Sequence, residues 1–144
     1  MSPDDKPTRA DDLDYYRHLR SRLEHEDNLI VERLAWLMAS ESFFFTAYAI
    51  ALNGAGTPQH RRLIHLIPLV AVASSALIYV GILAALRAAS WLRGMMRGRV
   101  PDEASLGLPP VHSPGPTRLA GLAAPLLLPP LFVTVWLYLL AATP

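Results

Sequence analysis

The chain has 144 residues, of which 52% are hydrophobic and 17% are charged, and its formal net charge at pH 7 is +1. A chain so close to electrical neutrality has no general attraction for nucleic acid, so we exclude nucleic acid as a partner. The sequence contains no cysteine, which excludes disulfides, thiolate metal sites, iron–sulfur clusters and lipid attachment through cysteine.

Residues 1–33 are polar overall and are predicted to lie in the cytoplasm. The first ten residues predict a loose tail. From about Asp12 onward, apolar residues recur at helical spacing, and neither Pro nor Gly interrupts the chain before Asn53. We therefore expect a long amphipathic helix that follows the tail and continues unbroken into the first apolar segment.

Three long apolar stretches dominate the rest of the chain. They comprise residues 34–52, 63–86 and 119–142, and they contain one charged residue, Glu41. At about 1.5 Å of rise per residue, each is long enough to cross a hydrocarbon layer of roughly 30 Å as a helix. Residues 53–58 are a turn by composition, so the first two stretches form an antiparallel hairpin. The predicted fold is an all-α integral membrane protein with three transmembrane helices and a long amphipathic N-terminal helix.

Residues 87–118 connect the second and third apolar stretches and consist of two parts. The first part is a basic juxtamembrane segment, and we expect its arginines to bind headgroups of the anionic inner leaflet. These arginines are Arg87, Arg93, Arg97 and Arg99. The second part contains five prolines and predicts neither helix nor sheet. Three further prolines within residues 125–130 predict a kink in the third transmembrane helix.

The distribution of Lys and Arg predicts the orientation. Eleven of the thirteen precede the first apolar stretch or lie between the second and the third, two lie in the first loop, and none follows the third. Short flanking segments rich in these residues stay in the cytoplasm, so we expect the N-terminus inside and the C-terminus outside. Four aromatic residues are expected to anchor the helices at the membrane interfaces: Trp36, Trp91, Trp136 and Tyr138.

Glu41 is the residue that most needs an explanation, because an ionisable group inside a span is unfavourable unless it is paired, neutral or next to a polar cavity. Counting inward from the ends of the spans places Tyr79 at its depth, together with Pro125 and Leu126, whose carbonyls lack their usual helical donors. We favour a neutral glutamic acid that ties the three helices together. The alternatives are a proton- or ion-handling carboxylate and a polar contact that specifies assembly.

No motif predicts an enzyme. The sequence lacks a phosphate-binding Gly loop, a nucleophile elbow and a zincin motif. His18 and His25 do not have the spacing that places two metal ligands on one helix face, and His65 has no partner histidine at its depth in another span. We therefore expect no catalytic residue, no metal site and no cofactor.

Residues 25–48 carry a distinctive arrangement of charged and aromatic side chains. The pattern is His-Glu-Asp-x-Leu-Ile-x-x-Arg-x-x-Trp-Leu at 25–37, followed by aromatic residues at 43, 45 and 48. It resembles a broad group of small, uncharacterised bacterial integral membrane proteins in which a charged N-terminal helix enters the first span. The resemblance implies a bacterial inner-membrane setting and no particular chemistry.

Two classes of function remain. The first is a non-enzymatic accessory, scaffold or assembly subunit of a larger inner-membrane complex, which docks through the N-terminal helix and the proline-rich loop at 100–118. The docking residues expected on the helix are Tyr16, Leu19, Leu23 and Arg33. The second is a homo-oligomeric pore or membrane-perturbing effector in which Glu41 faces the lumen. A lone carboxylate without a stripe of Ser, Thr or Asn makes a poor aqueous pore, so we favour the first class. The expected partners are membrane lipids and other membrane subunits or further copies of the chain.

Overall fold

The computed structural model describes residues 9–54, 58–99 and 115–142; within these ranges, the side chains of residues 9, 10, 12, 97–99 and 115–119 are not described. Nearly all of the described residues belong to three helices: α1 (Arg9–Asn53), α2 (Pro58–Arg99) and α3 (Gly115–Ala142). The described part of the chain contains no strand, so the all-α prediction is confirmed. All three helices are long and apolar enough to cross a membrane, which supports a membrane location.

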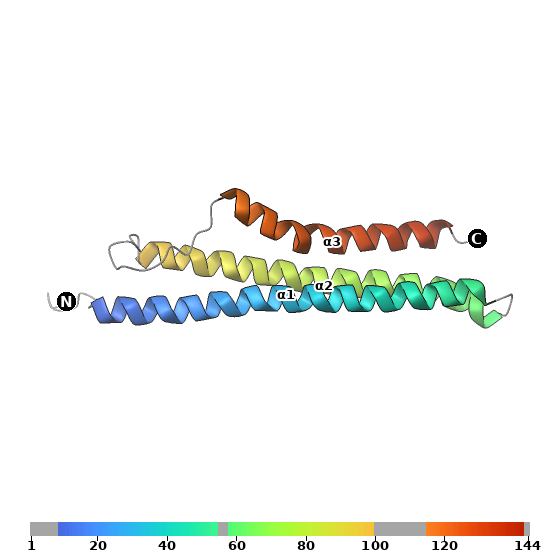
Figure 1. The fold of residues 1–144 in the computed structure, drawn as a ribbon, viewed down its shortest axis with the longest axis horizontal. Helices are drawn as coiled ribbons and strands as arrows, with labels where there is room; N and C mark the ends of the chain where they lie inside the picture. Colours follow the sequence, from blue (N-terminus) through green and yellow to red (C-terminus); the bar gives the residue numbers. More distant parts are fainter. Residues whose placement is uncertain (1–8, 55–57, 100–114, 143–144) are drawn as a thin grey trace.

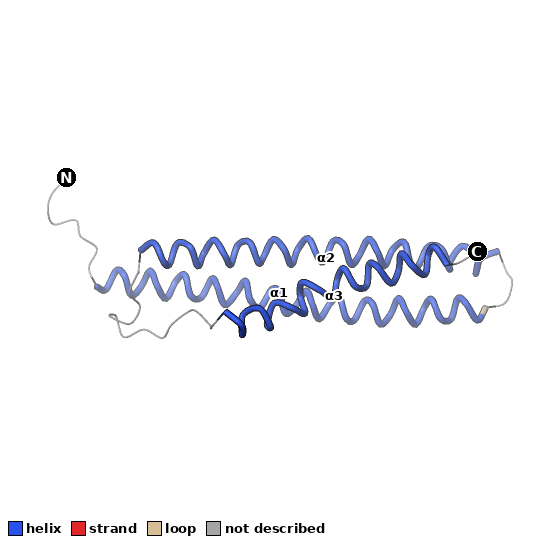
Figure 2. Tube along the Cα trace, turned by 90° about the horizontal axis from the view of Figure 1, so that it is seen from above, coloured by secondary structure: helices blue, strands red, loops and turns tan. Residues whose placement is uncertain are grey.

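The helices form an elongated antiparallel bundle with α2 as its common element (Figure 1). α1 and α2 lie side by side and run in opposite directions, and α3 lies over this hairpin and runs in the direction of α1 (Figure 2). α2 packs extensively against both of its neighbours, whereas α1 and α3 meet over a short stretch. The start of α1 and the end of α3 consequently lie at opposite ends of the bundle (Figure 1).

α1 is one continuous helix of 45 residues, as the absence of Pro and Gly between Ala10 and Asn53 predicted. It ends at a glycine, where the N–H of Gly54 donates to the carbonyl of Ile50 at 3.1 Å. A side chain at position 54 would overlap the imidazole of His60 at the start of α2. Residue 54 therefore lies close to the start of α2, and α1 and α2 form the predicted antiparallel hairpin.

α2 is longer than the predicted span at both ends. It includes Pro68, and it continues through the basic segment to Arg99, so residues 87–99 extend the span as regular helix. α3 begins at Gly115, four residues before the predicted start of the third span, so our assignment of 115–118 to a non-helical loop was wrong. Pro116 is tolerated there because the N–H groups in the first turn of a helix have no intrahelical partner. The rest of the proline-rich loop, residues 100–114, lies outside the described residues.

α3 remains helical through Pro125, Pro129 and Pro130 but is bent. Its N-terminal part turns away from α2, whereas its C-terminal part lies against the hairpin (Figure 1). Each of these prolines removes one backbone hydrogen bond and crowds the preceding turn, which is the ordinary cause of a helix kink. The predicted kink is thus present, and it leaves the C-terminal part of α3 to make the close contacts with α1.

The N-terminal part of α1 packs against the C-terminal part of α2. Three side chains of α1 and three of α2 form one buried cluster: Tyr16, Leu19, Leu23, Ala89, Leu92 and Met96. We call the paired segments 13–27 and 87–99 the arm; the blue end of α1 and the yellow end of α2 project past the start of α3 (Figure 1). The arm is therefore a two-helix structure with its own apolar interior.

Candidate functional site

A buried carboxyl group lies where the three helices meet. Glu41 of α1 is 1% exposed, and Ser75 of α2 and Trp136 of α3 are fully buried around it. The hydroxyl of Ser75 donates to Oε1 of Glu41. The indole N–H of Trp136 donates to Oε2 at 2.5 Å. Each helix thus contributes one polar side chain to a single hydrogen-bonded cluster, which we call the Glu41 cluster.

The donors restrict where a proton can reside on Glu41. An indole N–H can donate but cannot accept, so Oε2 must act as an acceptor. Were Glu41 neutral, its proton would therefore lie on Oε1, facing Ser75. A hydroxyl can both donate and accept, so Ser75 can serve either protonation state of the carboxyl group. The cluster satisfies both oxygens of Glu41 with groups of the same chain.

Aromatic side chains cover the Glu41 cluster. The ring of Phe45 stacks on Trp136 with 4.5 Å between centroids and 21° between planes. Tyr48 meets the same indole edge to face at 5.6 Å, and Phe132 lies 6.2 Å from Phe45. Such pairs are worth about 0.5–1.5 kcal/mol beyond the area that they bury. They hold the indole in place and exclude water from the carboxyl group.

The sequence placed Glu41 among the wrong partners. Tyr79 does not bond to it; Ser75, one turn earlier on α2, does. On α3 the partner is Trp136, ten residues beyond the predicted Leu126. The counting assumed that the cytoplasmic ends of the three spans lie at one depth, whereas α3 is displaced along the bundle by about 15 Å relative to that assumption. Trp136 is consequently buried, and our prediction that it anchors the outer interface was wrong.

One sequence signal could have indicated Ser75. Ala71 and Ser75 are small residues four positions apart on α2, a spacing that permits close helix approach. Both are fully buried, and Ala71 packs in the cluster that contains Tyr48 and Trp136. A small hydroxyl on a buried face of α2 is a natural donor to a buried carboxyl group. No comparable pattern marks Trp136 within the apolar run of α3.

Arg33 makes a second polar contact between α1 and α2. Its Nη1 donates to the backbone carbonyl of Gly81 at 2.6 Å. A Cβ atom at position 81 would lie 3.3 Å from the Nε of Arg33, so glycine leaves room for the guanidinium against the helix backbone. Gly81 lies within the predicted second span. The guanidinium group of Arg33 therefore reaches into the predicted hydrocarbon layer, although none of the three spans contains Lys or Arg.

Arg33 and Glu41 are not connected by polar groups. They lie on one face of α1 with Leu37 between them at four-residue spacing, and Leu37 is fully buried. Among the described residues, no hydrogen bond joins the two sites. A proton relay needs a continuous series of donors and acceptors, and Leu37 interrupts it.

The residues predicted to dock a partner make contacts within the chain itself. Tyr16, Leu19 and Leu23 are buried in the arm against α2, so our assignment of these three to partner docking was wrong. Arg33 binds Gly81, and its part in docking stays a prediction. The error arose because we placed the segment after Leu86 at the membrane surface. The continuation of α2 to Arg99 supplies the apolar surface that the N-terminal helix covers.

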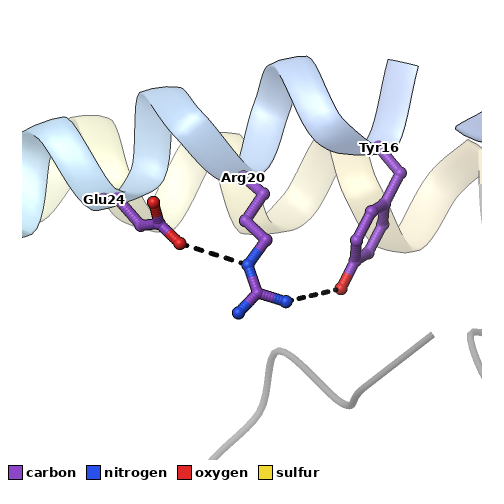
Figure 3. Close-up of polar contacts among 3 residues, drawn as sticks. All are labelled: Tyr16, Arg20 and Glu24. Carbon is purple, nitrogen blue, oxygen red and sulfur yellow. Dashed lines mark hydrogen bonds and ion pairs between the residues drawn. The ribbon is translucent and has the colours of Figure 1, made fainter. Parts of the chain in front are cut away.

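The exposed surface of the arm is charged. Arg20 donates to Glu24 at 3.1 Å and to the hydroxyl of Tyr16 at 3.4 Å (Figure 3). These hydrogen bonds, chiefly the one to Glu24, raise the pKa of Arg20 further above its usual value, so it is charged at any physiological pH. Arg17 pairs with Asp14 at 3.3 Å.

The basic residues of α2 differ in their environments. Arg93 bridges to Asp27 of α1 at 3.4 Å, and its side chain is 16% exposed, so it stabilises the arm, and its role at the headgroups stays a prediction. Arg87 is exposed, and its role at the headgroups stays a prediction. The side chains of Arg97 and Arg99 lie outside the description.

Three of the four predicted interface anchors have exposed side chains. These are Trp36, Trp91 and Tyr138. Exposure of large aromatic residues is what a lipid or partner contact requires, and their anchoring role stays a prediction. Within the described residues, no group of three or more His, Asp or Glu could hold a metal ion.

No protein-family model, curated protein or solved structure matches the chain. The resemblance to small bacterial membrane proteins at residues 25–48 therefore stays an expectation. The features of the chain that bear on its function are the Glu41 cluster, the arm and the exposed surfaces.

Proposed function

We propose that this protein is a non-enzymatic accessory or assembly subunit of a larger membrane complex. The observation that carries the proposal is the enclosure of Glu41. Its two oxygens accept hydrogen bonds from Ser75 and Trp136, and its side chain is 1% exposed. A carboxyl group so enclosed stabilises the three-helix bundle and presents no reactive atom to a substrate.

The enclosure of Glu41 also separates this proposal from the pore alternative. In a homo-oligomeric pore, Glu41 would have to face a lumen formed by several copies of the chain. Here it faces the interior of a single copy, behind Phe45, Tyr48 and Trp136. Opening it to water would require α3 to leave the hairpin, with loss of the hydrogen bond from Trp136.

The exposed surface of the arm is the region that we assign to a partner. Between α1 and α2 it carries a small hollow of about 260 Å³, the arm hollow. Its lining residues are Arg22, His25, Glu26, Ala88, Trp91 and Leu92. Trp91 is 65% exposed at its rim. An exposed Trp beside charged groups is typical of residues that dominate the binding energy of an interface.

The proposed location is the bacterial inner membrane, with the arm in the cytoplasm and the C-terminus outside. The arginine asymmetry supports this orientation. An odd number of crossings requires the two ends of the chain to be on opposite sides, and the three-helix topology agrees with it. The resemblance at residues 25–48 supports the bacterial setting.

Co-purification in mild detergent tests the proposal. Chains that co-purify with the wild type are identified by mass spectrometry and compared with those from Trp91→Ala and Trp36→Ala. Trp36 is equally exposed but lies outside the arm, so it controls for the loss of a surface indole. We expect Trp91→Ala to deplete a specific partner and Trp36→Ala to retain it. A lone monomer in native mass spectrometry from membranes, or ion conduction by liposomes that contain only this chain, would contradict the proposal.

A further inference from the structure

The start of α2 carries a hollow of about 780 Å³, the turn-end hollow. Among the described residues, its lining comes from one helix face: Pro58, Arg61, Arg62, His65, Leu66 and Leu69. This face points away from the buried residues of α2, and all these side chains are exposed. The turn-end hollow therefore opens outward, towards whatever surrounds the bundle. Its volume falls in the range of small-molecule sites, roughly 300–1,000 Å³.

The turn-end hollow is positively charged without nearby compensation. Arg61 and Arg62 are adjacent in the sequence, and no Asp or Glu occurs between Glu41 and Asp102 or after Glu103. Glu41 is enclosed about 20 Å further along the bundle, given the 13 or 14 residues that separate these arginines from Ser75. At the other end of α2, by contrast, Arg93 is paired with Asp27. The two arginines thus form the strongest uncompensated charge among the described side chains of this end.

The apolar half of the turn-end hollow lies directly beyond its arginines. Leu66 and Leu69 are 52% and 57% exposed and follow Arg62 on the same helix face. The predicted second span begins at Leu63, so the arginines lie at its boundary and these leucines lie within it. Over about 10 Å along the helix axis, the surface changes from two guanidinium groups to exposed leucine side chains. This is the polarity profile of a phospholipid, whose phosphate is at the interface and whose acyl chains enter the membrane.

We propose that the turn-end hollow binds one anionic phospholipid, with its phosphate on Arg61 and Arg62 and an acyl chain along Leu66 and Leu69. The guanidinium groups match a phosphate in charge and in planar donor geometry. The apolar contacts distinguish a lipid from free phosphate. The site does not depend on the orientation of the chain or on the partner proposed for the arm.

Native mass spectrometry of the full-length protein tests this site. The protein is exchanged into mild detergent that contains equimolar phosphatidylglycerol and phosphatidylcholine, and the ratio of the two bound lipids is measured. A basic residue close to an anionic lipid surface contributes about fivefold in affinity, so two arginines should favour phosphatidylglycerol by up to roughly 30-fold. Inorganic phosphate at millimolar concentration should not displace the lipid.

Arginine variants test which residues cause the preference for phosphatidylglycerol. Arg61→Gln combined with Arg62→Gln should bring the ratio of bound lipids close to one, whereas the double Lys variant should retain most of the preference. Arg17→Gln combined with Arg20→Gln removes the same charge from exposed positions on the arm, outside the arm hollow, and should leave the ratio unchanged. Equal retention of both lipids by the wild type, or an unchanged ratio in the double Gln variant, would refute the site. Displacement of the lipid by inorganic phosphate would refute the lipid site and indicate a site for a simple anion.

Discussion

The indole N–H of Trp136 donates to the Oε2 of Glu41 at 2.5 Å and joins the C-terminal part of α3 to the middle of α1. The other ring contacts between α1 and α3 involve Phe45, Tyr48 and Phe132 near this bond, whereas α2 packs extensively against both helices. Hydrogen bonds between transmembrane helices are worth about 0.6 kcal/mol on average and up to roughly 2 kcal/mol. This bond therefore helps to set the position of α3 along the hairpin, whereas the bond from Ser75 joins the two helices of the hairpin to each other.

The first prediction concerns substitutions at Glu41. In Glu41→Gln, the amide oxygen can accept from Trp136 while the amide nitrogen donates to Ser75, so we expect stability close to that of the wild type. Glu41→Leu leaves both donors buried without an acceptor and should lower the free energy of unfolding by about 1–2 kcal/mol. Unfolding in mixed micelles of mild detergent and dodecyl sulfate measures both values. Glu32→Leu, at an exposed position of α1, is the control.

The biological activity of Glu41→Gln can then test the structural role of Glu41 directly. A carboxyl group that only ties the helices together should be replaceable by the amide without loss of that activity. If Glu41→Gln alone abolished the biological role while it preserved stability, proton or ion handling would be favoured over packing.

The second prediction is the topology. We expect a C-terminal alkaline phosphatase fusion to be active and a C-terminal green fluorescent protein fusion to be dark, because alkaline phosphatase needs the oxidising exterior to fold. The physical reason is that the arginine-rich segments, one before the first span and one after the second, stay in the cytoplasm. The inverse pair of results would require these segments to cross the membrane.

The third prediction concerns the interior of the arm. Leu23→Ala removes a buried side chain that packs with Ala89 and Leu92, and should destabilise the arm locally by about 2 kcal/mol or more. Amide hydrogen exchange within 13–27 should then accelerate by roughly 30-fold, while the region around Glu41 stays protected. His18→Ala changes an exposed position on the same segment and should leave exchange unchanged. Uniform acceleration along α1 would indicate that the arm is not an independent unit.

Hydrophobic periodicity and the absence of helix breakers were sufficient to predict the three helices, the continuity of α1 and the hairpin turn. They were insufficient for the relative depths of the helices. A pattern repeated every 3.6 residues determines which side of a helix is buried, but it carries no information about translation along the axis. Ser75 was therefore missed by one turn and Trp136 by almost three turns. The arm was missed for another reason, because the C-terminal part of α2 was assigned to the membrane surface.

The last prediction uses Gly81 as a probe of the Arg33 contact. In Gly81→Ala, the new Cβ would lie 3.3 Å from the Nε of Arg33, a flexible side chain that can move by a few tenths of an ångström. Replacing Gly by Ala in a helix interior gains up to about 1 kcal/mol, so we expect this variant to be neutral or slightly stabilised. Gly81→Leu should instead displace the guanidinium from the carbonyl and lower the free energy of unfolding by about 1–3 kcal/mol. In the background of Arg33→Ala, where the guanidinium is absent, the leucine should be tolerated. Additive losses in that double variant would mean that the glycine serves only close helix packing, and that the hydrogen bond from Arg33 to Gly81 contributes little to the hairpin.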